Sequence, residues 1–106
     1  MAFVDFEPLA IQELRKITQQ GACEFGLKTA NRIIDEVERI GKRLEKHPKS
    51  GFPETLLEGR THEYRSCTLR KRFKMVYYYD EPTDTVHVMD FWDMRMSPTR
   101  LTKRMK

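Results

Sequence analysis

The feature of this sequence that most restricts its fold is a single change of hydrophobic period near Gly59. Before it, apolar side chains recur every three or four positions, the spacing of one face of an α-helix. This stripe consists of Ala30, Ile33, Ile34, Val37, Ile40 and Leu44. After Gly59, apolar and polar residues alternate at every second position, as they do in β-strands. The chain therefore predicts helices followed by a sheet, which is a layered α+β arrangement.

The residues before Gly59 predict one strand and two helices. Residues 3–6 alternate loosely and form a short strand in this interpretation. Pro8 suits the first turn of a helix, where its missing N–H costs nothing, and Gly21 is the predicted stop of that helix. The apolar stripe lies on the second helix, which Pro48 ends. Its apolar face predicts packing against a core.

The residues after Gly59 predict three strands and a last helix. Alternating segments cover 64–69 and 73–79, and a segment rich in β-branched and aromatic residues covers 85–92. Short turns between them, the first formed by Arg70, Lys71 and Arg72, predict an antiparallel meander. Ser97 and Pro98 resemble the start of a basic tail helix. The predicted order is β-α-α-β-β-β-α, with two N-terminal helices packed on one face of an antiparallel sheet and the other face partly open.

Size and composition predict one domain that works in the cytoplasm. A chain of 106 residues fits a single unit covering residues 1–106. No apolar run approaches the roughly 20 residues that a membrane span needs, so no membrane partner is expected. The N-terminus lacks the basic and apolar regions of a signal peptide. Cys23 and Cys67 do not make a disulfide framework, and they are expected to be free thiols.

The charge is unevenly distributed along the chain. Residues 1–59 carry nine Lys or Arg and ten Asp or Glu, whereas residues 60–106 carry eleven and six. The net charge of +4 therefore comes from the C-terminal part. This asymmetry indicates an anionic partner for that part, either a nucleic acid or an acidic protein segment.

The ordered motifs of the C-terminal half resemble the RelE/ParE superfamily of toxins. The matching stretches are Tyr64-Arg65-Ser66, Phe73-Lys74-Met75-Val76-Tyr77-Tyr78, Val86-His87-Val88 and Phe91-Trp92-Asp93-Met94-Arg95, followed by Ser97-Pro98 and a basic tail. The helix order and the break between Pro48 and Gly51 agree as well. The resemblance therefore covers nearly the whole chain.

This resemblance implies the toxin component of a bacterial type II toxin–antitoxin system with the RelE/ParE-like fold. RelE-like members bind the ribosomal A site and cut messenger RNA without a metal. ParE-like members inhibit DNA gyrase and cleave nothing themselves. Both kinds are neutralised by a cognate antitoxin that wraps the toxin. The implied partners are thus an antitoxin together with either the ribosome and mRNA or DNA gyrase, and no cofactor is expected.

Three cations align with catalytic positions of the RelE-like ribonucleases. Arg65 aligns with a catalytic lysine, Lys74 with a strand arginine, and Arg95 with the arginine after the last strand. Cleavage through the 2′-OH needs positive charge at the phosphorane-like transition state, together with a proton acceptor and a proton donor. We expect the three cations to lie on the open face of the sheet.

Two aligned positions depart from the ribonuclease pattern. Cys67 replaces a second strand lysine, and Leu101 replaces the tail tyrosine of RelE-like enzymes. The candidate RNA-binding residues are basic or aromatic, namely Arg70, Lys71, Arg72, Tyr78, Lys103 and Arg104. The three histidines show no clustering in the sequence, so no metal site is expected.

Three functions remain open at this point. The aligned cations favour a ribosome-dependent endoribonuclease. The missing tail tyrosine favours a gyrase inhibitor of the ParE kind. An inactive basic binding module is the third possibility. The three cations place the ribonuclease first and the gyrase inhibitor second.

Overall fold

A computed structural model describes residues 1–105 of the chain. Along the chain it contains the strand β1 (Phe3–Phe6), the helices α1 (Pro8–Phe25) and α2 (Leu27–Lys46), the strand β2 (Phe52–Pro53), a 3-10 helix η1 (Thr55–Leu57), the strands β3 (Tyr64–Leu69), β4 (Phe73–Asp80) and β5 (Thr85–Asp93), and the helix α3 (Pro98–Arg104). Among the described residues, no helix is long and apolar enough to cross a membrane.

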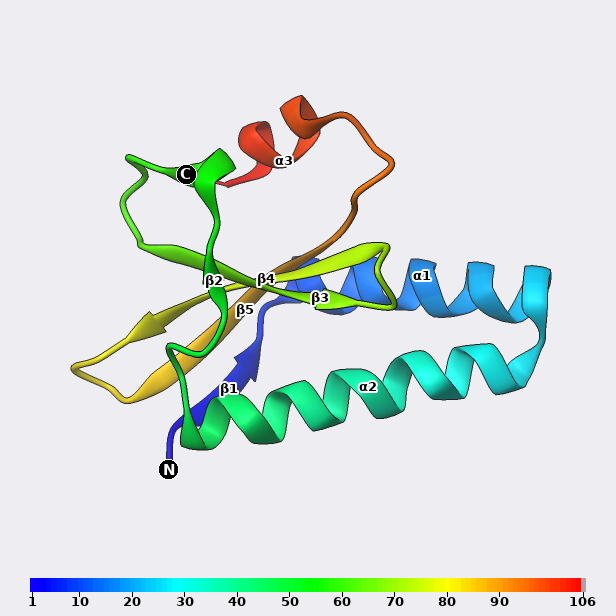
Figure 1. Cartoon of the computed structure of the whole chain (residues 1–106), viewed down its shortest axis with the longest axis horizontal. Helices are drawn as coiled ribbons and strands as arrows, with labels where there is room; N and C mark the ends of the chain where they lie inside the picture. The colour runs from blue at the N-terminus through cyan, green and yellow to red at the C-terminus, as the bar shows by residue number, and fades with distance from the viewer. Residues whose placement is uncertain (106) are drawn as a thin grey trace.

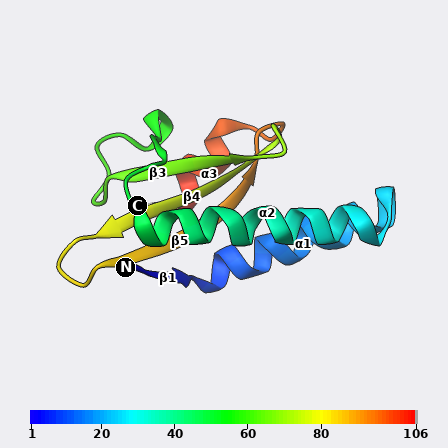
Figure 2. The ribbon, with the colours of Figure 1, turned by 60° about the horizontal axis from the view of Figure 1, so that its bottom comes forward.

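The five strands form one mixed sheet in the order β1-β5-β4-β3-β2. Figure 1 shows the α1–α2 hairpin running beyond the end of the sheet, and Figure 2 shows these helices on one side of it with α3 on the other. Each side buries its own apolar cluster. The cluster under α1 and α2 includes Val37, Leu44, Met75 and Tyr77. The cluster under α3 and η1 includes Leu57, Val76, Trp92 and Leu101.

The α+β fold and the antiparallel meander β3-β4-β5 are confirmed, and two additions complete the sheet. First, β1 pairs with β5 in parallel, so the sheet is mixed rather than wholly antiparallel. Second, the two residues of β2 pair with β3 at the opposite edge. A strand as short as β2 presents no alternation, and Pro53 argues against a strand in the sequence.

The prediction that α1 stops at Gly21 is wrong, because the helix continues to Phe25. Gly21 is buried and faces α2, where an added Cβ would lie 3.3 Å from Cδ1 of Ile33. A glycine at this point therefore serves the close approach of the two helices. The chain reverses instead at Gly26, whose φ of 91° is disfavoured for residues with a side chain.

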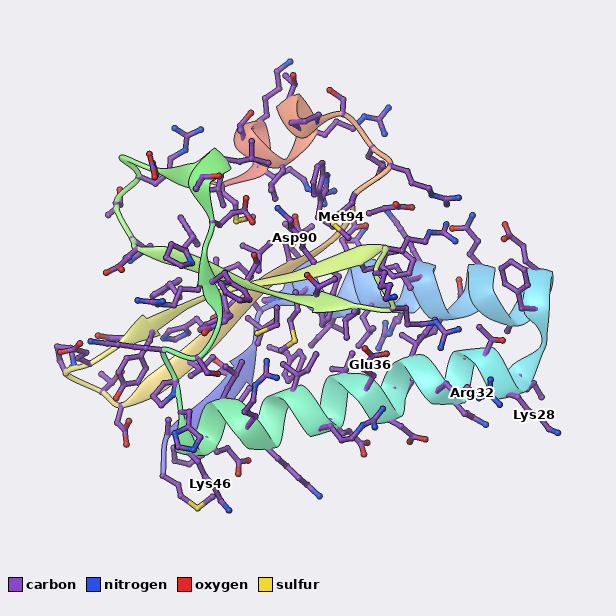
Figure 3. The ribbon with its side chains drawn as sticks, in the orientation of Figure 1. Lys28, Arg32, Glu36, Lys46, Asp90 and Met94 are labelled. Carbon is purple, nitrogen blue, oxygen red and sulfur yellow. The ribbon has the colours of Figure 1, made fainter. Side chains whose placement is uncertain are left out.

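The apolar stripe of α2 is confirmed as a core face. Ile33, Val37, Ile40 and Leu44 are all buried, while Ile34, at the edge of the stripe, is 36% exposed. On the charged side of the helix, the carboxylate of Glu36 accepts a hydrogen bond from the backbone N–H of Arg70 at 3.2 Å. Glu36 thus holds the β3–β4 hairpin above α2 (Figure 3). At the tip of this predicted hairpin, Arg70 and Lys71 adopt φ of 50° and 57°.

The helix α3 is held on the sheet by a buried ion pair. Asp90 on β5 is fully buried, and its two carboxylate oxygens accept hydrogen bonds from Nε and Nη2 of Arg104 at 3.0 and 2.9 Å. Asp90 lies between the sheet and α3 (Figure 3). Ser97 caps the start of α3 as predicted, because its Oγ accepts from the N–H of Thr99. The tail is therefore part of the folded structure.

The environment of Asp90 favours its neutral form. Burial raises the pKa of this carboxyl to about 6, although the Arg104 guanidinium opposes the rise. An unfolded aspartate has a pKa of about 3.9, so this group's contribution to stability is fully present below that pH. The contribution is lost as the pH rises through about 6. The charge on Asp90 is therefore tolerated mainly because Arg104 faces it.

We predict that Arg104→Ala destabilises the fold more than Asp90→Asn does. Removing Arg104 leaves a buried carboxylate without a cation, which costs about 3 kcal/mol, whereas Asn removes the charge itself. Urea unfolding at neutral pH measures both losses, with exposed Arg100→Ala in α3 as the control. The deficit of Arg104→Ala should shrink as the pH falls to about 6 and below, because Asp90 is then increasingly protonated in both folded proteins. Equal losses in the two variants would contradict this assignment.

Candidate functional site

Arg65, the first aligned cation, supports the chain rather than a ligand site. Its Nη1 donates to the backbone oxygens of Gly51 at 3.0 Å and Lys49 at 3.3 Å. Its Nη2 pairs with Glu63 at 3.2 Å, and the side chain is 17% exposed. These contacts fasten the connection between α2 and β2 to the sheet. The same connection is held by Tyr77, whose hydroxyl accepts from the N–H of Gly51.

Lys74, the second aligned cation, is neutralised by a buried carboxylate. Its Nζ lies 2.9 and 3.1 Å from the two carboxylate oxygens of Glu54. The Glu54 side chain is only 2% exposed, and it also accepts hydrogen bonds from the Ser66 hydroxyl and the N–H of Leu56. Two of these partners, Ser66 and Lys74, come from β3 and β4, so the network joins η1 to the sheet. The positive charge of Lys74 is therefore paired with the Glu54 carboxylate.

Arg95, the third aligned cation, follows β5 and is 63% exposed. Its Nη2 and Nε lie 3.2 and 3.3 Å from the Asp93 carboxylate. Asp93 also accepts from the backbone N–H of Arg95 and from Nη2 of Arg72. Of the three aligned cations, Arg95 is thus the most accessible to a ligand, although it carries a counterion.

The prediction that the three cations share the open face is wrong. In the β3–β4 ladder, Arg65 pairs with Tyr77, and Lys74 pairs with Thr68. Paired residues point to the same face and successive residues to opposite faces. Tyr77 belongs to the cluster under the helices, so Arg65 lies on the helix side of the sheet and Lys74 on the α3 side.

The two departures from the ribonuclease pattern are core residues. Leu101 is fully buried under α3, and Cys67 is buried on the helix side. Burial raises the pKa of the Cys67 thiol, although Arg43, with Nη2 3.3 Å from Sγ, opposes the rise. Cys67 therefore stays protonated near neutral pH. Neither position supplies a proton acceptor or a proton donor to a ligand on the surface.

Tyr78 lies on the same face of the sheet as Lys74, as predicted, and other rings already stack on it. The His62 ring is stacked with it at a centroid distance of 3.8 Å, and the His87 ring at 4.9 Å. Tyr64 meets it edge-on at 5.9 Å. A base would have to displace one of the imidazoles in order to stack on Tyr78. These rings therefore pack against one another on one face of the sheet in this structure.

The other candidate RNA-binding residues divide into exposed and paired side chains. Arg70, Lys71 and Lys103 are exposed. Arg72 is bound to Asp93, and Arg104 is bound to Asp90. Exposed positive charge therefore remains at the tip of the β3–β4 hairpin and on α3, outside the three aligned positions.

The hairpin tip borders a groove between the sheet and the far halves of α1 and α2. This groove has an apolar floor and a charged rim. Its lining includes Ile17, Phe25, Ile33 and Phe73, with Arg70, Arg72 and Glu24 as the charged residues. Phe25, at the end of α1, is 65% exposed. An exposed apolar surface with a charged rim is typical of a protein-binding site.

Sequence reasoning missed Glu54 and Asp90, the two buried carboxylates that bind these cations. Glu54 lies in a segment without periodicity, and Asp90 lies between the apolar pairs Val88-Met89 and Phe91-Trp92. The isolated acid inside the β5 pattern was a usable signal, because a buried carboxylate requires a partner. Nothing in the local sequence indicates that Glu54 is buried.

The chain is similar to known proteins in its sequence and in its fold. Residues 4–98 match the family described as ParE toxin of type II toxin-antitoxin system, parDE. A search of curated proteins finds no match. Among solved structures, the chain is similar to one described as the chromosomal ParDE TA system from P. aeruginosa, with 16% identity, a TM-score of 0.69, and coverage of 88% of this chain and 96% of that chain.

Two further structures share the fold. A metal-bound toxin from Helicobacter pylori has 18% identity and a TM-score of 0.65, with coverage of 90% of this chain and 97% of that chain. The isolated E. coli RelE toxin has 17% identity and a TM-score of 0.59, with coverage of 98% of both chains. At such identities the likeness concerns the fold alone.

We predict that Lys74 and Glu54 form a coupled pair. Lys74→Met should destabilise the fold by about 3 kcal/mol, because it leaves the buried Glu54 carboxylate without a cation. The double variant Lys74→Met/Glu54→Gln should recover most of this loss, since both charges are then removed. Urea unfolding of the single and double variants measures the coupling. A Lys74→Met variant as stable as the parent would show that Glu54 does not depend on Lys74.

Proposed function

Because this chain belongs to the ParE toxin family of type II toxin–antitoxin systems, we propose that it acts in the cytoplasm by binding and inhibiting DNA gyrase, without cleaving RNA itself. We thus place gyrase inhibition ahead of RNA cleavage, whereas the aligned cations in the sequence favoured RNA cleavage. The observation that carries it is the neutralisation of Lys74 by the buried Glu54, at 2.9 Å. Lys74 therefore holds the start of η1 on the sheet through its contact with Glu54.

Electrostatic requirements of RNA cleavage support this choice. A phosphorane-like transition state needs several preorganised donors around one phosphate. Here Arg65 lies on the other side of the sheet from Lys74, and Arg95 is paired with Asp93. A single phosphate on the open face would meet at most part of this set, and only after ion pairs had been broken.

The aligned positions also lack the groups that would transfer protons during RNA cleavage. Metal-free cleavage needs a group that accepts the 2′-OH proton and another that protonates the leaving oxygen. The buried side chains of Leu101 and Cys67 occupy the aligned positions, and arginine at position 65 does not give up its proton. Inhibition by binding needs neither group, so the same residues are compatible with a ParE-like toxin.

We predict that the purified protein inhibits the supercoiling reaction of DNA gyrase and leaves ribosome-bound messages intact. A supercoiling assay and primer extension on a message translated in a purified bacterial system test the two activities side by side. Growth arrest should persist in the double variant Lys74→Met/Glu54→Gln, because the Lys74 charge is not used. Cuts within A-site codons that disappear in Arg65→Ala or Arg95→Ala would instead establish the ribonuclease.

Membership of the family implies a cognate antitoxin, and we place one of its segments in the groove between the hairpin tip and the helices. Phe25, Ile33 and Phe73 offer an apolar floor, and the exposed Arg70 offers positive charge at the rim. Arg72 lies beside it but is paired with Asp93. A segment with apolar residues on one side and Asp or Glu on the other complements this surface. The antitoxin would then contact the helix side of the sheet as well as the hairpin tip.

We predict that Arg70→Glu lowers the affinity for the antitoxin about tenfold, because it places like charges at the rim of the groove. Arg39→Glu is the matched control, since Arg39 is an exposed arginine of α2 that does not line the groove. Titration of each folded variant with the product of the adjacent gene measures the difference. Equal losses in both variants would assign the effect to net charge and contradict the groove.

A further inference from the structure

The parallel pairing of β1 with β5 brings three metal-binding side chains together. Asp5 is the register partner of His87, and Glu7 follows two residues later at the start of α1. Nδ1 of His87 lies 3.0 Å from Oε1 of Glu7 and 4.0 Å from Oδ2 of Asp5. One donor atom from each residue lies within 4.8 Å of the other two.

This cluster carries an excess of negative charge. It has two carboxylates and one imidazole, and within residues 1–105 no Lys or Arg forms an ion pair with Asp5 or Glu7. By contrast, the carboxylates of Glu54, Asp90 and Asp93 each have a cationic partner. A divalent cation would balance the charge of Asp5 and Glu7, which a single imidazole does not.

The surroundings hold the imidazole in position. The Tyr78 ring is stacked on His87 with an interplanar angle of 24°, and His62 is stacked on Tyr78 in turn. The Glu7 side chain does not cap α1, although Glu7 occupies the N-cap position, and it turns to His87 instead. The His87 and Glu7 side chains are 21% and 33% exposed, whereas Asp5 is 61% exposed and is able to adjust.

We propose that Asp5, Glu7 and His87 bind a divalent transition-metal ion, with Zn²⁺ as the best match. One imidazole nitrogen and two carboxylate oxygens suit zinc, whose ligands lie about 2.0–2.2 Å from the ion and hence about 3.3 Å apart around a tetrahedron. Small movements of Asp5 and Glu7 bring the three donors to that spacing. Solvent on the exposed side supplies the fourth ligand. This site departs from the expectation of no metal, which considered the spacing of the histidines alone.

The bound ion would tie the N-terminal strand to β5. Asp5 and Glu7 flank the connection from β1 into α1, and His87 lies 80 residues further along the chain than Glu7. A ligand that binds only the folded chain stabilises it in proportion to the logarithm of its concentration. Metal binding is thus expected to raise the melting temperature.

The test is a calorimetric titration of the full chain with ZnCl₂ at neutral pH after treatment with a chelator. The protein carries Cys23→Ser, because that exposed thiol is a competing ligand. We expect one ion per chain and an increase in melting temperature. His87→Asn and the double variant Asp5→Asn/Glu7→Gln should each lower the affinity at least about tenfold and remove the increase in melting temperature.

The control is His47→Asn, which removes a histidine at the end of α2, outside the cluster, and should bind zinc like the parent. Circular dichroism first establishes that each variant is folded. Should His87→Asn fail to fold, the double variant, which keeps side chains of the same shape, decides the matter. Zinc binding that is absent from the parent, or unchanged in the folded cluster variants, would overturn the proposal.

Discussion

Strand β4 is buried on both of its faces, and the rest of the structure is arranged around this constraint. Met75 and Tyr77 are fully buried under the helices, while Val76 between them is fully buried under α3 and η1. A strand of this kind needs a cover on each side, because backbone and side chains at its centre have no access to water. The tail helix and the segment around η1 are therefore structural layers, although they contain few residues.

The layer between the sheet and the segments η1 and α3 contains two buried carboxylates, and each of them binds a nearby cation. Lys74 lies in the same row as Val76, and Glu54 neutralises it at the edge of the smaller cluster. Asp90 enters the same layer from β5 and is neutralised by Arg104. Each pair attaches a peripheral segment to the sheet, because breaking a buried pair leaves an unpaired charge. A lysine or arginine paired in this way has to leave its carboxylate in order to bind a phosphate, and the buried carboxylate is then left unpaired.

Local pattern was sufficient for most of the secondary structure. The stripe of α2, the three long strands and the capped tail helix follow from periodicity and from the residues at their ends. Prediction from the sequence was wrong or incomplete where the role of a residue depends on a contact with another segment of the chain. Gly21 is a glycine for the approach of α2, not for a turn. Glu54 and Asp5 are ordinary acids in the sequence, and their partners, Lys74 and His87, lie on strands far along the chain.

By itself, the sequence determined the class of fold, the helix and strand segments, and the resemblance to a toxin superfamily, because these depend on spacings within a few residues. Tertiary structure alone decided which side chains meet. The register of β3 with β4 separates Arg65 from Lys74, and the parallel pairing of β1 with β5 brings Asp5 to His87. A shift of one residue in a ladder moves a side chain to the other face. Function in this fold therefore depends on strand register, which is set by long-range packing and not by local sequence.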